Sequence, residues 1–227
     1  GTRSIEGVVK ADDADNLGAT PDTTALGILG WLAPRQRPFV MECADRTAAD
    51  RKGGHLARDA GDGRLVLREV AQCPPDDAAA FQDITRHRYF NTNNLWLDLA
   101  AVKDLVTTSG GRLGLPLIRN KKPLDPTDPA SPEVFQLEAA MGAAIALMPG
   151  AAAVRVPRSR FVPVKTTNDL LVLWSDVFER TPEGFVRAVP ERASDLPLVD
   201  LDPAFYKNID DFIARVGAPP SLRGAKK

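Results

Sequence analysis

The position most suited to chemistry is Lys165, which stands between an extended segment and a helix. Residues 154–164 mix β-branched residues with two prolines, a composition typical of extended backbone away from the centre of a sheet. From Thr167 or Asn168 onward the pattern predicts a helix, with apolar residues at Leu170, Leu171, Leu173, Trp174, Val177 and Phe178. A lysine beside the free N–H groups of a helix N-terminus suits a phosphate or pyrophosphate. A surface lysine before an ordinary helix fits the same spacing.

A second candidate is the acidic run that contains Asp12, Asp13 and Asp15. A carboxylate just before a helix can hold a metal ion or a sugar hydroxyl, and a solvated acidic turn explains the same residues. The next residues predict a helix with Thr20 as its N-cap and Pro21 at its first position. Its expected apolar face carries Leu26, Leu29 and Leu32.

Two further stretches offer groups that bind sugars or phosphates. In the turn Lys52-Gly53-Gly54, glycines without a Cβ let the backbone approach a ligand closely, although turn geometry alone accounts for them. The run Asn91-Thr92-Asn93-Asn94 places three amides together, and asparagine tolerates left-handed and turn conformations. Such a cluster can bind vicinal hydroxyls, or it can form a turn whose amides bond to their own backbone.

The elements that must position these residues alternate between strands and helices. We expect a short buried strand at 39–43, then a hairpin, because Asp62-Gly63 signals a type I′ turn and 64–70 alternates afterward. A modest helix is expected at 76–86. This alternation predicts an α/β fold, a mixed sheet with helices on its faces.

The second half of the chain continues this pattern. Asp98 is expected to cap a helix over 99–106, and a strand is expected at 115–119. Helical spacing is clearest over 134–148, and a last helix is expected over 205–216. The apolar residues that predict the 134–148 helix are Val134, Leu137, Met141, Ile145 and Met148.

Composition excludes several classes of function. The 227 residues carry 29 basic and 30 acidic side chains, a net charge of −1, so no basic field favours nucleic acid or a membrane surface. Cys43 and Cys73 are the two cysteines and only two histidines occur, so neither a disulfide framework nor a zinc site is indicated. No signal-peptide pattern and no long apolar run appears, so we expect a cytoplasmic protein in a reducing cytosol.

Five blocks of sequence together resemble one enzyme family. They are DNLGAT, FNTNNLWLDLAAVK, IRNKKPLD, FQLEAAMGAAI and VPRSRFVPVKTTNDLL. In this order they are similar to the UTP–glucose-1-phosphate uridylyltransferases of the eukaryotic type, and the resemblance covers about residues 13–227. It implies a nucleotide-diphospho-sugar-transferase-like (Rossmann-like) fold.

The resemblance covers a partial domain, the second half of the family's catalytic domain. The glycine-rich uridine loop and the C-terminal β-helix of the family have no counterpart here, so we expect little or no activity from this chain alone. Residues 1–12 are polar and are expected to be a linker, an exposed arm or a segment added by cloning. The family has a buried strand before DNLGAT, and no convincing strand is seen in this sequence.

Site residues follow from the resemblance by position. Asp15 matches the aspartate of an Asn-x-Asp pair that the family associates with substrate and Mg²⁺, and Asp13 stands where the family has asparagine. Lys165 matches the lysine expected to neutralise charge on the phosphates.

The sugar is expected to meet other residues of the matching blocks. The resemblance assigns Lys52 and Gly54 to a turn near sugar and phosphate, and Asn93 to sugar contact. Lys122 matches a basic position that supports the site, and an exposed lysine is the equal alternative.

The implied reaction joins UTP and glucose 1-phosphate into UDP-glucose and pyrophosphate, with Mg²⁺ assisting in-line attack on the α-phosphorus. A related UDP-sugar pyrophosphorylase, acting on N-acetylglucosamine 1-phosphate or on a broad range of sugar 1-phosphates, fits the same blocks. A third hypothesis is a non-catalytic module that binds sugar nucleotides, because the uridine loop is missing and Asp13 replaces asparagine. No nucleic-acid or membrane partner is expected.

Overall fold

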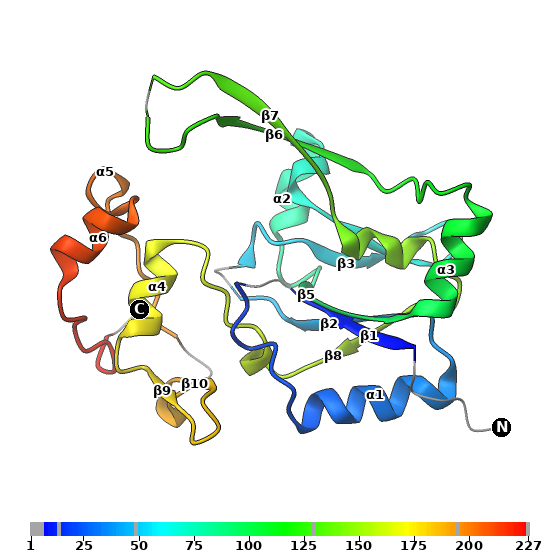
Figure 1. Cartoon of the computed structure of the whole chain (residues 1–227), viewed down its shortest axis with the longest axis horizontal. Helices are drawn as coiled ribbons and strands as arrows, with labels where there is room; N and C mark the ends of the chain where they lie inside the picture. The colour runs from blue at the N-terminus through cyan, green and yellow to red at the C-terminus, as the bar shows by residue number, and fades with distance from the viewer. Residues whose placement is uncertain (1–6, 13–14, 48–49, 129, 194–195, 226–227) are drawn as a thin grey trace. The chain divides into compact units, whose positions relative to one another are not determined.

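The computed structural model describes residues 7–12, 15–47, 50–128, 130–193 and 196–225 (Figure 1). Contacts divide the chain into two compact units. The first unit comprises residues 1–12 and 21–156, and the second comprises 13–20 and 157–227.

The first unit is built on a mixed sheet. Among the described residues, its strands are β1 (Val8–Ala11), β2 (Phe39–Asp45), β3 (His55–Arg58), β4 (Leu65–Arg68), β5 (Tyr89–Asp98) and β8 (Ala152–Arg155). They follow the order β4-β3-β5-β2-β8, and β1 pairs with β5. The β2–β8 pair is parallel and the others are antiparallel, which confirms the predicted mixed α/β sheet.

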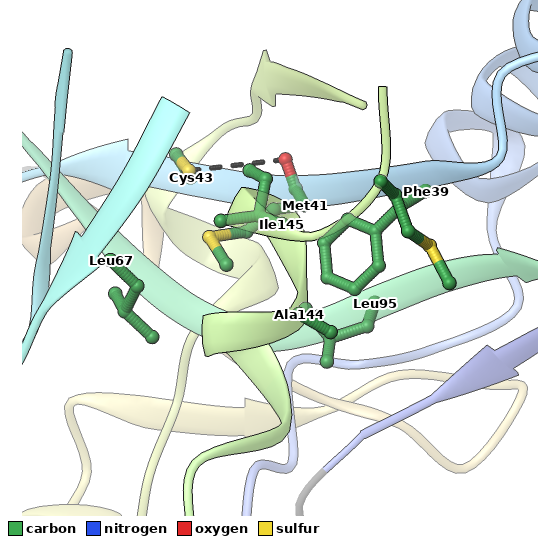
Figure 2. Close-up of a cluster of buried hydrophobic side chains, with 8 residues drawn as sticks. Phe39, Met41, Cys43, Leu67, Leu95, Ala144 and Ile145 are labelled. Atoms are coloured by element: carbon green, nitrogen blue, oxygen red, sulfur yellow. Dashed lines mark hydrogen bonds between the residues drawn. The ribbon is translucent and has the colours of Figure 1, made fainter. Parts of the chain in front are cut away.

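Helices cover both faces of this sheet because β2 is apolar on both sides. On one face Val40 packs with Ile28 and Leu32 of α1 (Thr23–Arg35). On the other face lie the 3₁₀ helix Met141–Ala146 and α3 (Leu99–Thr108). Figure 2 shows the second of these clusters, in which Phe39, Met41, Cys43, Leu67, Leu95, Ala144 and Ile145 pack together.

Cys43 is part of this core rather than a reactive thiol. Its side chain is buried, and its Sγ lies 3.8 Å from the carbonyl of Met41 (Figure 2). Burial and the neighbouring Glu42 raise the pKa of the Cys43 thiol well above its usual range. The thiol therefore stays protonated and inert.

The helix predicted over 134–148 is wrong for its first part, whereas Met141–Ala146 within it form a 3₁₀ helix. Residues Glu133–Ala139 form β7, which pairs antiparallel with β6 (Leu117–Pro123) in a separate two-stranded sheet. The apolar residues of this segment also fit a period of two, and pairing with β6 supplies backbone partners that a helix pattern does not reveal. Across the pair, the Arg119 guanidinium lies 4.7 Å from the centroid of the Phe135 ring. The strand predicted at 115–119 is thus displaced toward Pro123.

The start of α1 also differs from the predicted boundary. The cap of α1 is Asp22, which accepts a hydrogen bond from the Ala25 N–H at 2.9 Å, so Thr20 is not its N-cap. The buried face of α1 carries Ala25, Ile28 and Leu32, whereas Leu26 is 68% exposed. Aspartate is an effective capping residue, and its choice moves the helix start by two positions.

The turn and the strand before the acidic run also differ from expectation. The β3–β4 hairpin exists, but its turn runs from Asp59, whose N–H donates to the Arg64 carbonyl, and only Gly63 has positive φ there, at 73°. A type I′ turn needs two such residues, so that assignment is wrong. β1 is a strand at a place where the sequence showed none convincingly, and it pairs with β5 over four residues.

Two helix predictions in the first unit have different outcomes. α2 (Ala78–Gln82) is shorter than the expected 76–86 and buries Phe81. Asp98 caps α3 as predicted, accepting from the N–H groups of Ala100 and Ala101. The strand predicted at 39–43 is confirmed within β2.

The second unit contains α4 (Thr167–Trp174), α5 (Pro203–Tyr206), α6 (Ile209–Val216) and the pair β9 (Phe178–Arg180) and β10 (Val186–Ala188). Its buried residues include Leu171, Val177, Val189 and Phe212. The single helix predicted at 205–216 is therefore two helices, and Val177 and Phe178 lie beyond α4. No helix in the described part of the chain is long and apolar enough to cross a membrane.

Candidate functional site

Lys165 and Asp15 lie together in the second unit. The Val164 N–H donates to the Asp15 carbonyl at 3.0 Å, and Asn16 and Pro163 form an antiparallel bridge. The two predicted residues come from distant parts of the sequence, and this backbone pairing makes them neighbours. The sequence alone could not show this.

The Lys165 side chain is exposed and is available to a ligand. Among the described residues, its ammonium makes no ion pair. Its backbone N–H donates to Asp169 Oδ2 at 3.0 Å, and the Thr166 N–H donates to the same oxygen at 2.8 Å. The cap of α4 is Thr166, one residue before the predicted candidates.

This cap changes the chemistry expected at the helix start. Because the Asp169 carboxylate takes the N–H groups of Lys165 and Thr166, they are not free for a phosphate, as the sequence had suggested. A phosphate here would be bound by the ammonium of Lys165.

Asp15 has a carboxylate oxygen in need of a partner. Its Oδ1 is buried and, in the described part of the chain, has no hydrogen-bond partner. A buried charged oxygen without a partner is costly, and a bound cation would remove that cost. No cluster of three or more His, Cys, Asp or Glu residues that could hold a metal ion occurs within the described residues. Asp13 lies outside the described residues.

A second group of site residues lies in the first unit, around Gly54. The Gly54 carbonyl accepts from the Asn91 N–H at 2.9 Å. Asn91 Oδ1 in turn accepts from the Asn93 N–H at 2.9 Å, and Asn91 Nδ2 donates to Asn93 Oδ1. The structure thus brings Gly54 and Asn93 together through Asn91.

The asparagine run is a bulge in a strand rather than a turn. β5 continues through it, but Met41 pairs with Leu95 and Cys43 pairs with Asn91, so β5 carries two extra residues opposite Glu42. Asn93 has φ of 56°, as the expected tolerance of left-handed backbone allows.

The buried side of this bulge is held by Glu42. Its carboxylate accepts from Asn94 Nδ2 at 3.2 Å and from Trp96 Nε1 at 2.9 Å. Its carbonyl accepts from the Thr92 hydroxyl at 2.8 Å. The side chains of Thr92 and Asn94 therefore form buried hydrogen bonds with Glu42. Asn91 bonds to Gly54 and to Asn93.

Glu69 is a candidate that residue patterns alone did not single out. A Cβ added to Gly54 would lie 2.5 Å from Glu69 Oε2, so this carboxylate faces the glycine directly. The signal in the sequence was its place in the segment EVAQ, just after the β3–β4 hairpin.

The two other predicted lysines lie in different places. Lys52 is exposed two residues before Gly54. Lys122 is exposed in β6, which pairs with β7 rather than with the main sheet.

Arg46 holds the backbone that leads into the glycine turn. Its guanidinium donates to the carbonyls of Asp50 at 3.2 Å and Arg51 at 2.7 Å. It also donates to the carbonyls of Phe81 at 3.1 Å and His87 at 3.2 Å. A buried arginine thus joins the turn to α2 and to the segment just before β5.

His55 lies in the same cluster and is kept neutral. Its ring stacks on that of His87, with centroids 4.1 Å apart, and lies within 3.4 Å of Arg46 and Arg68. Burial first, and then the nearby His87 and arginines, lower the pKa of His55 to about 3. Burial and nearby arginines also lower the pKa of His87.

Comparison with known proteins identifies the family of this chain. The model of the UTP–glucose-1-phosphate uridylyltransferase family matches residues 10–227. The chain belongs to this family. Among the family's enzymes, those of Saccharomyces cerevisiae and Solanum tuberosum are 41% and 40% identical over 215 and 211 residues, which are 95% and 92% of this chain.

Solved structures of the family agree in fold. The UDP-glucose phosphorylase of Trypanosoma brucei matches with a TM-score of 0.85 and 46% identity over 95% of this chain. A point mutant of the Leishmania major UDP-glucose pyrophosphorylase in complex with UDP-glucose matches with a TM-score of 0.83 and 44% identity, again over 95% of this chain.

The matches cover only part of these relatives. The chain spans 41% of the Saccharomyces enzyme and 42% of the Solanum enzyme. It spans 46% of the Trypanosoma chain and 47% of the Leishmania chain. Membership of the uridylyltransferase family is thus shown for less than half the length of a typical member.

Proposed function

We propose that this chain is part of an enzyme that forms UDP-glucose and pyrophosphate from UTP and glucose 1-phosphate. The observation that carries the proposal is the pairing of the Asp15 and Lys165 segments in a member of this family. Within the described residues, it joins the segment that carries an unpartnered carboxylate oxygen to the segment that carries an ammonium without an ion pair. These two groups suit a metal-bound triphosphate.

The chain's residues act by placing charge rather than by covalent chemistry. The oxygen of the sugar phosphate attacks the α-phosphorus of UTP in line, and pyrophosphate leaves. Lys165 offsets negative charge on the phosphates. We assign Mg²⁺ to Asp15, and the ion when bound would neutralise charge on the phosphate oxygens. Asp13, two residues before Asp15, remains a proposed contact to the substrate.

The group around Gly54 is proposed to hold the sugar. Asn93 offers an amide, which can accept from and donate to vicinal hydroxyls, and Glu69 offers a carboxylate, which accepts from them. Gly54, without a Cβ, leaves room for the Glu69 carboxylate, and we propose that the exposed Lys52 contacts the sugar's phosphate. We keep Lys122 as a supporting residue, without a direct role in this group.

The test measures pyrophosphate release from UTP and Mg²⁺ with glucose, galactose and N-acetylglucosamine 1-phosphates in turn. It compares this chain with a version extended upstream to the length of its relatives. Release with glucose 1-phosphate in the extended protein is expected. Equal or faster release with N-acetylglucosamine 1-phosphate would instead select the related pyrophosphorylase, and binding of UDP-glucose without release would select the non-catalytic module.

A further inference from the structure

We propose that Asn16 is a positioning residue that sets the distance between Asp15 and Lys165. The inference deepens the proposed function and rests on it. Asn16 is not expected to touch substrate. It acts by joining the acidic segment to the extended segment that ends at Lys165.

Both the oxygen and the nitrogen of the Asn16 side-chain amide form hydrogen bonds. Its Oδ1 accepts from the Val162 N–H at 2.9 Å and from the Gly18 N–H at 3.0 Å. Its Nδ2 donates to the Arg160 carbonyl at 3.1 Å. The residue is only 6% exposed, so water cannot readily replace these bonds.

These bonds sit between two backbone bonds that flank the site. The Leu17 N–H donates to the Val162 carbonyl at 3.0 Å, and the Val164 N–H donates to the Asp15 carbonyl at 3.0 Å. Asn16 therefore lies at the centre of a short ladder that joins the two segments. Asp15 and Lys165 are at one end of this ladder.

The rest of segment 15–20 packs closely against Arg160. A Cβ on Gly18 would lie 2.5 Å from the backbone carbon of Arg160, so no other residue fits at this position without movement. Arg160 is 1% exposed, and its guanidinium donates to the Thr20 carbonyl at 3.0 Å. The segment 15–20 is thus fixed to Arg160 at both its start and its end.

The chemistry requires such a fixed distance. The metal ion proposed at Asp15 and the ammonium of Lys165 would act on the same phosphates, and their charges help only if both are in place in the transition state. A misplacement of about 1 Å can cost on the order of 100-fold in rate. The Asn16 amide supplies both an acceptor for two N–H groups and, on a separate atom, a donor for a carbonyl.

The local effect is tested by hydrogen exchange in the extended protein. Asn16→Ala is expected to raise amide exchange of a peptide over 160–166 by at least about tenfold, because the Val162 and Val164 N–H groups lose protection. Asn16→Asp keeps the acceptor for Val162 and should restore part of that protection. Unchanged exchange over 160–166 in Asn16→Ala would overturn the proposal.

The functional effect is tested by kinetics with Mg²⁺ titration. Asn16→Ala is expected to lower kcat by about 10- to 100-fold and to raise the Mg²⁺ concentration for half-maximal rate, with KM for glucose 1-phosphate changed less than about threefold. If Asn16→Ala does not fold, Asn16→Ser, which shortens the side chain and removes the amide without adding a charge, takes its place in the same comparison.

Asn168→Ala is the matched control. Asn168 Oδ1 accepts from the Leu201 N–H at 3.0 Å in the same unit, so its loss removes a similar bond away from Asp15. We expect it to lower the melting temperature without changing the Mg²⁺ dependence. An equal rise in Mg²⁺ requirement in Asn168→Ala would overturn the proposal, because it would show a general loss of stability.

Direct Mn²⁺ binding, measured by electron paramagnetic resonance without substrate, gives a readout independent of turnover. Weaker Mn²⁺ binding in Asn16→Ala than in the parent is expected, and equal binding would contradict the proposal.

Failure of the proposed function would give a different result from failure of this inference. In that case the parent itself shows no pyrophosphate release, whereas failure of this inference leaves an active parent and an equally active Asn16→Ala.

Discussion

At the scale of single residues, the proposed chemistry depends on one cation and one carboxylate. Lys165 has no ion pair among the described residues, and Asp15 Oδ1 is a buried oxygen without a partner there. Most charged groups of a folded protein that are removed from water have partners. The buried Asp15 oxygen is an exception, and the exposed Lys165 lies on the neighbouring segment, which is why we propose that a ligand binds there.

Removal of the Lys165 ammonium should slow the reaction without unfolding the protein. Lys165→Ala in the extended protein is expected to lower kcat by about 10²- to 10³-fold, because a preorganised charge at the phosphates is lost. The measurement is steady-state pyrophosphate release. Lys207→Ala, at an exposed lysine of the same unit, is the control. Turnover within a few-fold of the parent in Lys165→Ala would contradict the assignment.

Removal of the Asp15 charge should weaken binding of the metal ion. Asp15→Asn is expected to raise the Mg²⁺ concentration for half-maximal rate by at least about tenfold, because an amide oxygen is a weaker ligand than a carboxylate. Asp12→Asn is the control, since the Asp12 carboxylate already pairs with Lys10 at 2.5 Å. If both variants respond equally to Mg²⁺, the ion is bound by the acidic segment in general and not by Asp15.

At the scale of elements, the glycine turn and the β5 bulge form one proposed sugar site. The bulge gives Asn93 its left-handed backbone, and Glu42 fixes the bulge from the buried side. Arg46 holds the residues before Gly54 through carbonyls of Asp50 and Arg51. The position of each polar group is therefore set by a buried partner rather than by the loop sequence.

The space at Gly54 can be tested with one methyl group. Gly54→Ala would bring a Cβ to 2.5 Å from Glu69 Oε2, and the displaced carboxylate is expected to raise KM for glucose 1-phosphate by about tenfold. Gly53→Ala is the matched control, because its Cβ would meet only the Asp50 carbonyl at 3.3 Å. An unchanged KM in Gly54→Ala would remove Glu69 and Gly54 from the sugar site.

At the scale of the whole molecule, stability should depend on pH through buried histidine. The pKa of His55 is lowered to about 3 in the folded state, so the unfolded state binds more protons between about pH 6.5 and pH 3. Full stability is expected above about pH 6.5 and is lost as the pH falls through this window. Nearby Arg46, Arg68 and His87 all oppose protonation, and only Asp77 favours it.

The size of this effect can be measured by urea unfolding at pH 7 and pH 5. Between pH 7 and pH 5, protonation of His55 in the unfolded state is expected to lower the free energy of unfolding by about 1–2 kcal/mol. His55→Phe should lose that part of the dependence, and His87, which is closer to the surface, should account for less. An NMR titration that shows His55 protonated at pH 6 would contradict the prediction.

Sequence alone determined the local features of this protein. The strand within β2, the cap at Asp98 and the mixed α/β class follow from residue patterns, because they depend on near neighbours and on alternating hydrophobicity. The five family blocks likewise named Asp15, Asn93 and Lys165, whose roles remain proposals.

Tertiary structure decided which residues meet. Residues 134–148 have helical spacing, yet pairing with β6 makes β7 a strand, because cross-strand hydrogen bonds outweigh a weak local preference. Asp15 lies beside Lys165 only because Asn16 and the backbone of 162–164 bond across a long stretch of sequence. Contacts between residues far apart in the chain leave no periodic signal, so only the folded structure reveals them.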